Sequence, residues 1–149
     1  MSAGSLIDFA NNVSKLMPDI MREFLKRQTR EVAEGNISLP QMLILDILKD
    51  KGSMRMGELA KYLGVSMAAA TGIVDRLVRS GFALRGGSPD DRRIVNISIT
   101  LPGKKIIQKH NQARQKALIE IFGSLSASDR DKYIEILSKI QRHLKETEE

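Results

Sequence analysis

The chain has 149 residues, a length that suits one compact domain with a hydrophobic core of its own. It carries 24 Lys and Arg against 18 Asp and Glu, and this formal net charge of +6 favours an anionic partner such as nucleic acid or a membrane surface. The absence of Cys excludes disulfides and a thiol sensor, while the lack of a signal peptide and of any apolar run of ~18 residues predicts a cytoplasmic protein without a membrane span.

The first two predicted helices cover residues 5–34 and 38–51. Residues 5–34 carry an apolar stripe with helical period, which packs either in the core or against another subunit. The stripe consists of Leu6, Phe9, Val13, Leu16, Ile20 and Phe24. Pro18 is expected to kink this helix or to begin its second part. Ser38 is a good N-cap for the second helix, because Gln41 follows three residues later and can complete a capping box.

A helix-turn-helix pattern follows. A short helix over residues 57–63 is predicted to end at Gly64, because glycine adopts the left-handed conformation that ends a helix at little cost. Ser66 then provides an N-cap for a second helix over residues 67–80. Two helices joined by so short a turn are typical of a helix-turn-helix.

The second of these helices has two contrasting faces. Its predicted buried stripe consists of Ala70, Ile73, Val74 and Leu77. The opposite face consists of Met67, Ala68, Thr71, Gly72, Asp75, Arg76 and Arg79. Small residues at its start allow a helix to approach a groove floor, and the arginines further along reach phosphates or guanine edges. Taken alone, this helix is equally compatible with an ordinary solvated surface helix.

The next stretch predicts a two-stranded ribbon, the wing. Residues 82–85 and 94–100 are predicted strands, and the second alternates apolar with polar residues. Residues 86–93 between them, Gly-Gly-Ser-Pro-Asp-Asp-Arg-Arg, are expected to form a mobile, charged turn. A short third strand beside the wing is expected at residues 54–56. A ribbon directly after such a helix makes a winged helix-turn-helix.

Two further helices complete the predicted chain. Thr100 can cap a helix over residues 101–122, and Ser126 can cap the last helix. The last helix carries a two-heptad seam suited to helix–helix packing, with Tyr133, Leu137, Ile140 and Leu144. Together with the first helix, it is predicted to form a dimerisation lobe.

No group of residues predicts catalysis or a metal site. His110 and His143 lie in different predicted helices without an acid at ligand spacing, and both are expected to be partly exposed surface residues. Asp90 and Asp91 are adjacent, but a wing tip offers no enclosed pocket that would shift their pKa values. We therefore predict neither an enzyme nor a bound cofactor or metal.

Several short motifs resemble one known family. The run Asp91-Arg92-Arg93, followed by an alternating strand and then by Thr100 and Gly103, is similar to the wing motif of the MarR family of transcriptional regulators. Three other runs resemble that family's helix-turn-helix: Glu58-Leu59-Ala60, Gly64-Val65-Ser66 and Asp75-Arg76-Leu77. The chain departs from the family at Ser88 and Asp90, where many members carry Asp and Arg, so its wing tip is less basic.

The resemblance implies a mostly α-helical fold with a small β-wing, in one domain spanning residues 1–149. Residues 37–100 would form the winged helix-turn-helix lobe that binds DNA, and residues 1–36 and 101–149 the dimerisation lobe. It also implies a homodimer on double-stranded DNA with a pseudo-palindromic operator, and a repressor that a small-molecule effector releases.

The predicted roles of individual residues follow from these motifs and faces. The predicted DNA contacts are Ser66, Met67, Ala68, Thr71, Gly72, Arg76, Arg79, Arg92 and Arg93. Arg93 is expected to enter a narrow minor groove, where the negative potential is enhanced, with Arg92 as the alternative. Asp91 is expected to hold a wing arginine in place, because DNA would repel its carboxylate. Candidate residues for the effector site, or alternatively core filler, are Met17, Met21 and Met42.

Two other binding functions compete with DNA recognition. A winged-helix module that binds a protein would use the same helix face as a docking surface. An RNA-binding module would need aromatic side chains for base stacking, and the Phe and Tyr residues are few and do not cluster with the basic ones. Sequence-specific binding of double-stranded DNA is therefore the favoured prediction.

Overall fold

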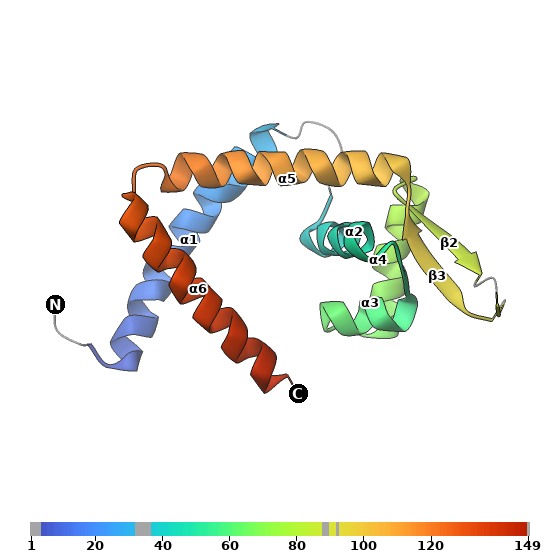
Figure 1. Ribbon diagram of the computed structural model, residues 1–149, viewed down its shortest axis with the longest axis horizontal. Coiled ribbons are helices and arrows are strands. Elements are labelled where there is room, and N and C mark those ends of the chain that lie inside the picture. The colour runs from blue at the N-terminus through green and yellow to red at the C-terminus, as the bar shows by residue number, and fades with distance from the viewer. Residues whose placement is uncertain (1–3, 32–36, 88–89, 92, 149) are drawn as a thin grey trace. The chain divides into compact units, whose positions relative to one another are not determined.

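The computed structural model describes residues 4–31, 37–87, 90–91 and 93–148. Over these residues the chain forms helices α1 to α6 and a small sheet of strands β1 to β3 (Figure 1). This confirms the predicted fold class, mostly α-helical with a small β-wing. The contacts divide the chain into two compact units, one of Val32–Gln112 and one of Met1–Glu31 with Ala113–Glu149.

Helix α2 (Leu39–Lys51) begins at the predicted capping box. The Ser38 hydroxyl oxygen accepts the Gln41 N–H at 3.3 Å, and Gln41 Oε1 accepts the Ser38 N–H at 2.9 Å. The helix ends at Gly52, whose φ of 84° favours glycine. Its inner side supplies three fully buried residues to the core of the Val32–Gln112 unit, namely Ile44, Leu45 and Leu48.

The predicted helix-turn-helix consists of α3 (Met56–Leu63) and α4 (Met67–Arg79). Gly64 has the expected left-handed conformation, with a φ of 67°. The Ser66 hydroxyl oxygen accepts the Ala69 N–H at 3.1 Å and so caps α4 as predicted. The predicted inner stripe of α4 is confirmed, with Ala70, Val74 and Leu77 fully buried and Ile73 partly buried.

The sheet is antiparallel, with the strand order β1-β3-β2. Its strands are β1 (Ser53–Arg55), β2 (Ala83–Gly87) and β3 (Val95–Ile99). A third strand beside the wing is confirmed, but it lies one residue earlier than predicted, because Met56 already belongs to α3. The prediction that the turn starts at residue 86 is wrong. Gly86 and Gly87 belong to β2 and pair with Asn96 and Val95. Because strand pairing uses backbone groups alone, two glycines can extend a ladder that their side chains do not indicate.

The junction between β3 and α5 (Leu101–Phe122) explains the paired Thr and Gly of the wing motif. The Thr100 hydroxyl donates to the Gly81 carbonyl at 2.6 Å, and its oxygen accepts the Gly103 N–H at 3.1 Å. A Cβ on Gly103 would lie 2.1 Å from the Phe82 carbonyl oxygen, so this approach admits only glycine. Together these two residues hold the base of the wing against the start of α5.

The unit of Met1–Glu31 and Ala113–Glu149 contains α1 (Leu6–Glu31), the end of α5, and α6 (Ala127–Thr147). Helix α1 neither ends nor restarts at Pro18, which lies inside it. Arg27 Nε pairs with Glu120 Oε2 at 3.2 Å and links α1 to α5. The Ser126 hydroxyl oxygen caps α6 by accepting the Asp129 N–H at 3.1 Å, as predicted. Among the described residues, no helix is long and apolar enough to cross a membrane.

Candidate nucleic-acid interface

Helix α4 presents the predicted contact residues of the helix-turn-helix together. Its inner side packs on α2, α3 and β2, so the outer face is held by the core of the Val32–Gln112 unit. Two of the predicted contacts on the outer face are half-buried, Thr71 and Gly72. The other predicted contacts, at the cap and on the outer face, are exposed, namely Ser66, Met67, Ala68, Arg76 and Arg79. Apart from Met67, small side chains occupy the first turns of this face, and guanidinium groups occupy the last turn. This arrangement suits a helix that lies in a groove and contacts the backbone at one end.

The hydroxyl of Thr71 is already committed as a donor. Thr71 Oγ1 donates to the Met67 carbonyl oxygen, one turn earlier, at 2.8 Å. A hydroxyl has a single hydrogen, so Thr71 offers a partner only its lone pairs and its methyl group. In the major groove these groups match the amino group of adenine or cytosine and the methyl group of thymine.

An ion pair that the sequence alone did not reveal joins α4 to the wing. Arg85 Nη2, on β2, pairs with Asp75 Oδ1, on α4, and the side chains are 38% and 42% exposed. An exposed pair of this kind adds little stability, but it neutralises the one acidic side chain predicted on the groove-facing side of α4. In the sequence, the one hint of this ion pair was an acid and a base on consecutive elements. Their pairing could not be predicted from that hint, because it depends on the turn at Gly81 that brings β2 back beside α4.

The wing tip is partly described, with Asp91 and Arg93 inside the described residues and Ser88 and Arg92 outside them. Asp91 Oδ1 accepts the backbone N–H of Arg93 at 2.9 Å, and the Asp91 carbonyl accepts the Ile94 N–H at 3.1 Å. The Asp91 carboxylate therefore bonds to the backbone at Arg93. Both side chains are exposed, and their roles toward DNA stay predictions.

A second surface with functional potential lies on the other unit. No described residue of α6 is buried. The predicted seam is largely uncovered, with Tyr133 40%, Leu137 43%, Ile140 51% and Leu144 56% exposed. Helix α1 exposes further large apolar side chains, among them Leu6, Phe9 and Leu16. So many uncovered apolar side chains on one small unit indicate an interaction surface.

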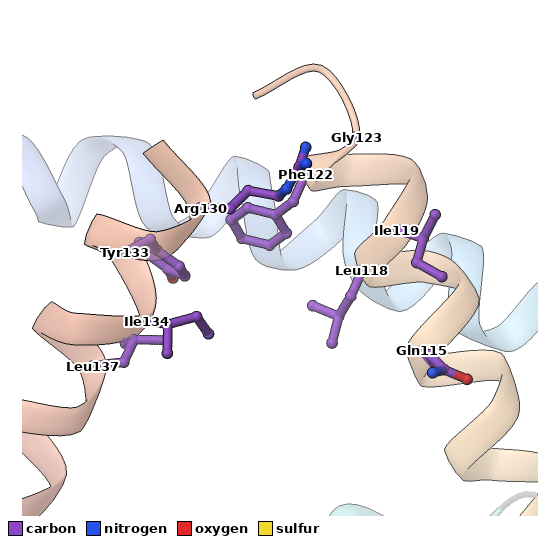
Figure 2. A pocket seen from close by; sticks show the side chains of 9 residues that line it. All are labelled: Gln115, Leu118, Ile119, Phe122, Gly123, Arg130, Tyr133, Ile134 and Leu137. Atoms are coloured by element: carbon purple, nitrogen blue, oxygen red, sulfur yellow. The ribbon is translucent and has the colours of Figure 1, made fainter. Parts of the chain in front are cut away.

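An open groove of about 560 Å³ lies on this surface, between the end of α5 and the start of α6. Figure 2 shows Phe122 and Leu118 from α5 and Tyr133 from α6 along its sides. The rings of Phe122 and Tyr133 have their centroids 5.1 Å apart. The other lining residues are Gln115, Ile119, Gly123, Arg130, Ile134 and Leu137. This mainly apolar lining suits apolar side chains as occupants, and it includes none of the methionines predicted for an effector site.

Those three methionines lie in different surroundings. Met42 is 9% exposed and belongs to the core cluster of the Val32–Gln112 unit. Met17 and Met21, both on α1, are 44% and 47% exposed. Met42 is thus part of the hydrophobic core, as the alternative interpretation expected. The two α1 methionines lie on the largely uncovered apolar side of their helix.

His110 differs from its prediction. The prediction of a partly exposed surface residue is wrong for His110, which is 7% exposed, whereas His143 is exposed. The reason is its place on the buried stripe of α5, three and four residues after Ile107 and Ile106. Neither ring nitrogen has a hydrogen-bond partner among the described residues. The described residues as a whole contain no cluster of three or more potential metal ligands.

Burial should make the stability of the fold sensitive to pH through His110. Loss of hydration lowers the pKa of His110 from its ordinary value of 6.5, so the folded chain protonates this ring only at a lower pH than the unfolded chain does. The unfolded chain binds a proton on this ring below about pH 6.5, so the free energy of unfolding falls as the pH drops through that value. We expect His110→Leu to reduce the loss of Tm between pH 7 and pH 5, and His143→Leu to keep it. An unchanged pH dependence in His110→Leu would contradict this assignment.

Comparisons with known proteins agree with this geometry. Residues 37–95 match the sequence model of the MarR family. The chain is 33% identical to the uncharacterized HTH-type transcriptional regulator YfiV of Bacillus subtilis, over 73% of this chain and 68% of the relative. It is 28% identical to the HTH-type transcriptional repressor YetL of the same organism, over 97% of this chain and 84% of the relative. A mutant MarR of E. coli complexed with operator DNA has a similar fold, with a TM-score of 0.70 and 23% identity, over 92% of this chain and 99% of that one.

Proposed function

Because this chain belongs to the MarR family of helix-turn-helix transcriptional regulators, we propose that it binds a pseudo-palindromic operator as a homodimer and represses transcription there. The observation that carries the proposal is the outer face of α4. This face is small in the first turns, where base edges are approached, and carries Arg76 and Arg79 in the last turn, where phosphates are reached. The pairing of Asp75 with Arg85 removes an unpaired negative charge from this face.

The uncovered apolar surface of α1 and α6 is the proposed contact with a second copy of the chain. The seam of α6 repeats at the spacing that packs one helix against another, and its residues are 40–56% exposed. The groove between α5 and α6 adds an apolar recess to the same surface. A two-fold interface of this kind presents two copies of α4 to two half-sites, and this is the reason for a pseudo-palindromic operator.

Repression and release complete the proposal. The name of YetL as a repressor supports repression as the output for this chain. Release by a small-molecule effector is what membership of the family leads us to expect. A compound that raises the Tm of the free protein and lowers its DNA affinity in the same concentration range would identify the effector.

The function is tested by the salt dependence of DNA binding, with the wing as the probe. We expect the wild-type chain to bind duplex DNA with an affinity that falls steeply as salt rises, because phosphate contacts release counterions. Arg93→Ala should weaken binding and lower the slope of log K against log salt by about one per subunit. Asp91→Ala should weaken binding as well, because the backbone N–H of Arg93 loses its acceptor.

Asp131→Ala serves as the charge-matched control, because it removes one exposed acid from α6 and leaves the wing intact. We expect it to bind DNA with the wild-type slope. If Asp91→Ala and Asp131→Ala both tightened binding, net charge would account for the data and the wing role would fail. A wild-type chain with no affinity for duplex DNA would instead favour the protein-binding module.

A further inference from the structure

Gly72 lies in the middle of α4, and nothing within the fold requires glycine there. Its φ is not among the positive values, so its backbone does not need a residue without a Cβ. A Cβ built at this position would have no neighbouring heavy atom within 4 Å outside the local helix backbone. Glycine in a helix interior lowers helix stability relative to alanine, because it loses more conformational freedom on folding. The sequence therefore keeps a destabilising residue without a visible internal reason.

Two other glycines of the same unit, Gly103 and Gly64, do have internal reasons. A Cβ on Gly103 would collide with the Phe82 carbonyl oxygen at 2.1 Å, and Gly64 needs its left-handed backbone to end α3. Gly72 has neither feature, and neither has Gly57 on α3. Gly72 differs from Gly57 in its place on the outer face of α4, so a reason outside the fold would act on the side of α4 that faces away from the core.

The position of Gly72 on the helix surface shows which side of α4 a partner would contact. Residues four apart on a helix lie one above the other, so Ala68, Gly72 and Arg76 form one row along the outer face. The Arg76 side chain does not cover Gly72, since no heavy atom lies near its Cβ position. The row thus has its lowest point at Gly72, next to Thr71 and open to a partner.

We infer that Gly72 is the point where the backbone of α4 touches the DNA, and that the partner leaves no room for a Cβ there. This inference rests on the proposed function, because it takes duplex DNA as the partner of this face. A helix with its side chains is about 10–12 Å across, and the major groove is about 12 Å wide. The absence of one side chain on the groove side lets the helix lie deeper, which brings the acceptor and methyl group of Thr71 to the base edges.

One substitution should therefore have opposite effects on two measurements. Gly72→Ala should raise the Tm of the free protein by about 1–4 °C, because alanine favours the helix and finds open space. The same variant should lower the affinity for the preferred duplex by about 10–100-fold, because the added methyl group meets the DNA in a packed interface. Tm is measured by calorimetry without DNA, and affinity by fluorescence anisotropy.

Gly57→Ala is the matched control, because Gly57 lies on α3 and its Cβ would meet only Met67 Sδ, at an ordinary 3.8 Å. It should raise the Tm without changing the affinity. Wild-type affinity in Gly72→Ala, an equal loss in both variants, or a lower Tm in Gly72→Ala would each overturn the inference. If the wild-type chain bound no duplex DNA at all, that result would contradict the proposed function, and with it the inference about Gly72.

Discussion

Leu137→Asp is expected to convert the proposed dimer into a monomer and to lower operator affinity by about 100-fold. Leu137 lies in both the α6 seam and the groove between α5 and α6, and it is 43% exposed in the single chain. A carboxylate placed there would lose its hydration against apolar side chains of the second copy. A monomer holds one half-site only and loses the high effective concentration of the second, which typically contributes a factor of about 10²–10⁴. Sedimentation velocity and anisotropy measure the two effects on the same sample.

Ser138→Asp provides the matched control for this prediction. It adds the same charge to the same helix, one residue beyond Leu137 and outside the seam, where Ser138 is exposed and its hydroxyl donates to the Ile134 carbonyl. We expect this variant to remain a dimer with wild-type affinity. Removal of residues 126–149 should act like Leu137→Asp, because it deletes the whole seam. Sedimentation of the wild-type chain as a monomer would contradict the assignment of this surface.

Thr71→Ala is expected to cost about 1–3 kcal/mol of binding free energy on the preferred duplex and little on random DNA. The reason is that Thr71 presents an acceptor and a methyl group near the start of α4, while its hydrogen is held by the Met67 carbonyl. Two further variants separate these groups. Thr71→Ser removes the methyl group and keeps the hydroxyl, whereas Thr71→Val removes the hydroxyl and keeps the methyl group. The variant that binds the preferred duplex more weakly therefore identifies, by the group it has lost, the group that reads the base.

Arg79→Ala is the comparison for Thr71. Arg79 is exposed in the last turn of α4, so its guanidinium group should contact phosphates. Its removal should therefore weaken the binding of preferred and random duplexes by the same factor. Competition anisotropy with preferred and random duplexes gives both affinities for each variant. If Thr71→Ala and Arg79→Ala lowered specific and random binding by the same factor, the orientation of α4 in the groove would be wrong.

The features that the sequence predicts well are the ones that neighbouring residues determine. The N-caps at Ser38, Ser66 and Ser126 form the expected hydrogen bonds, because each cap needs only a partner three residues away. The left-handed Gly64 was predictable for the same reason. The outer face of α4 also follows from the helical period, so the sequence alone locates the candidate site on this helix.

The features that the sequence does not predict depend on distant contacts. Gly86 extends β2 because the backbone of β3 is there to pair with it. His110 is buried because the side of α5 that carries Ile106 and Ile107 is covered, which a lone polar residue did not reveal. The pairing of Asp75 with Arg85 requires the turn that brings the wing back to α4. Gly72 is a case of another kind, because its proposed reason lies in the partner and outside the chain.

Selection of bound duplexes from a random pool tests the central claim most directly, because it reports sequence preference and symmetry in one measurement. A homodimer that presents two α4 helices should enrich an inverted repeat whose half-sites lie about one helical turn, ~10 base pairs, apart from centre to centre. The same selection with Leu137→Asp should lose the repeat. A single unrepeated motif from the wild-type chain, or no enrichment at low salt, would contradict a dimeric, sequence-specific DNA-binding regulator.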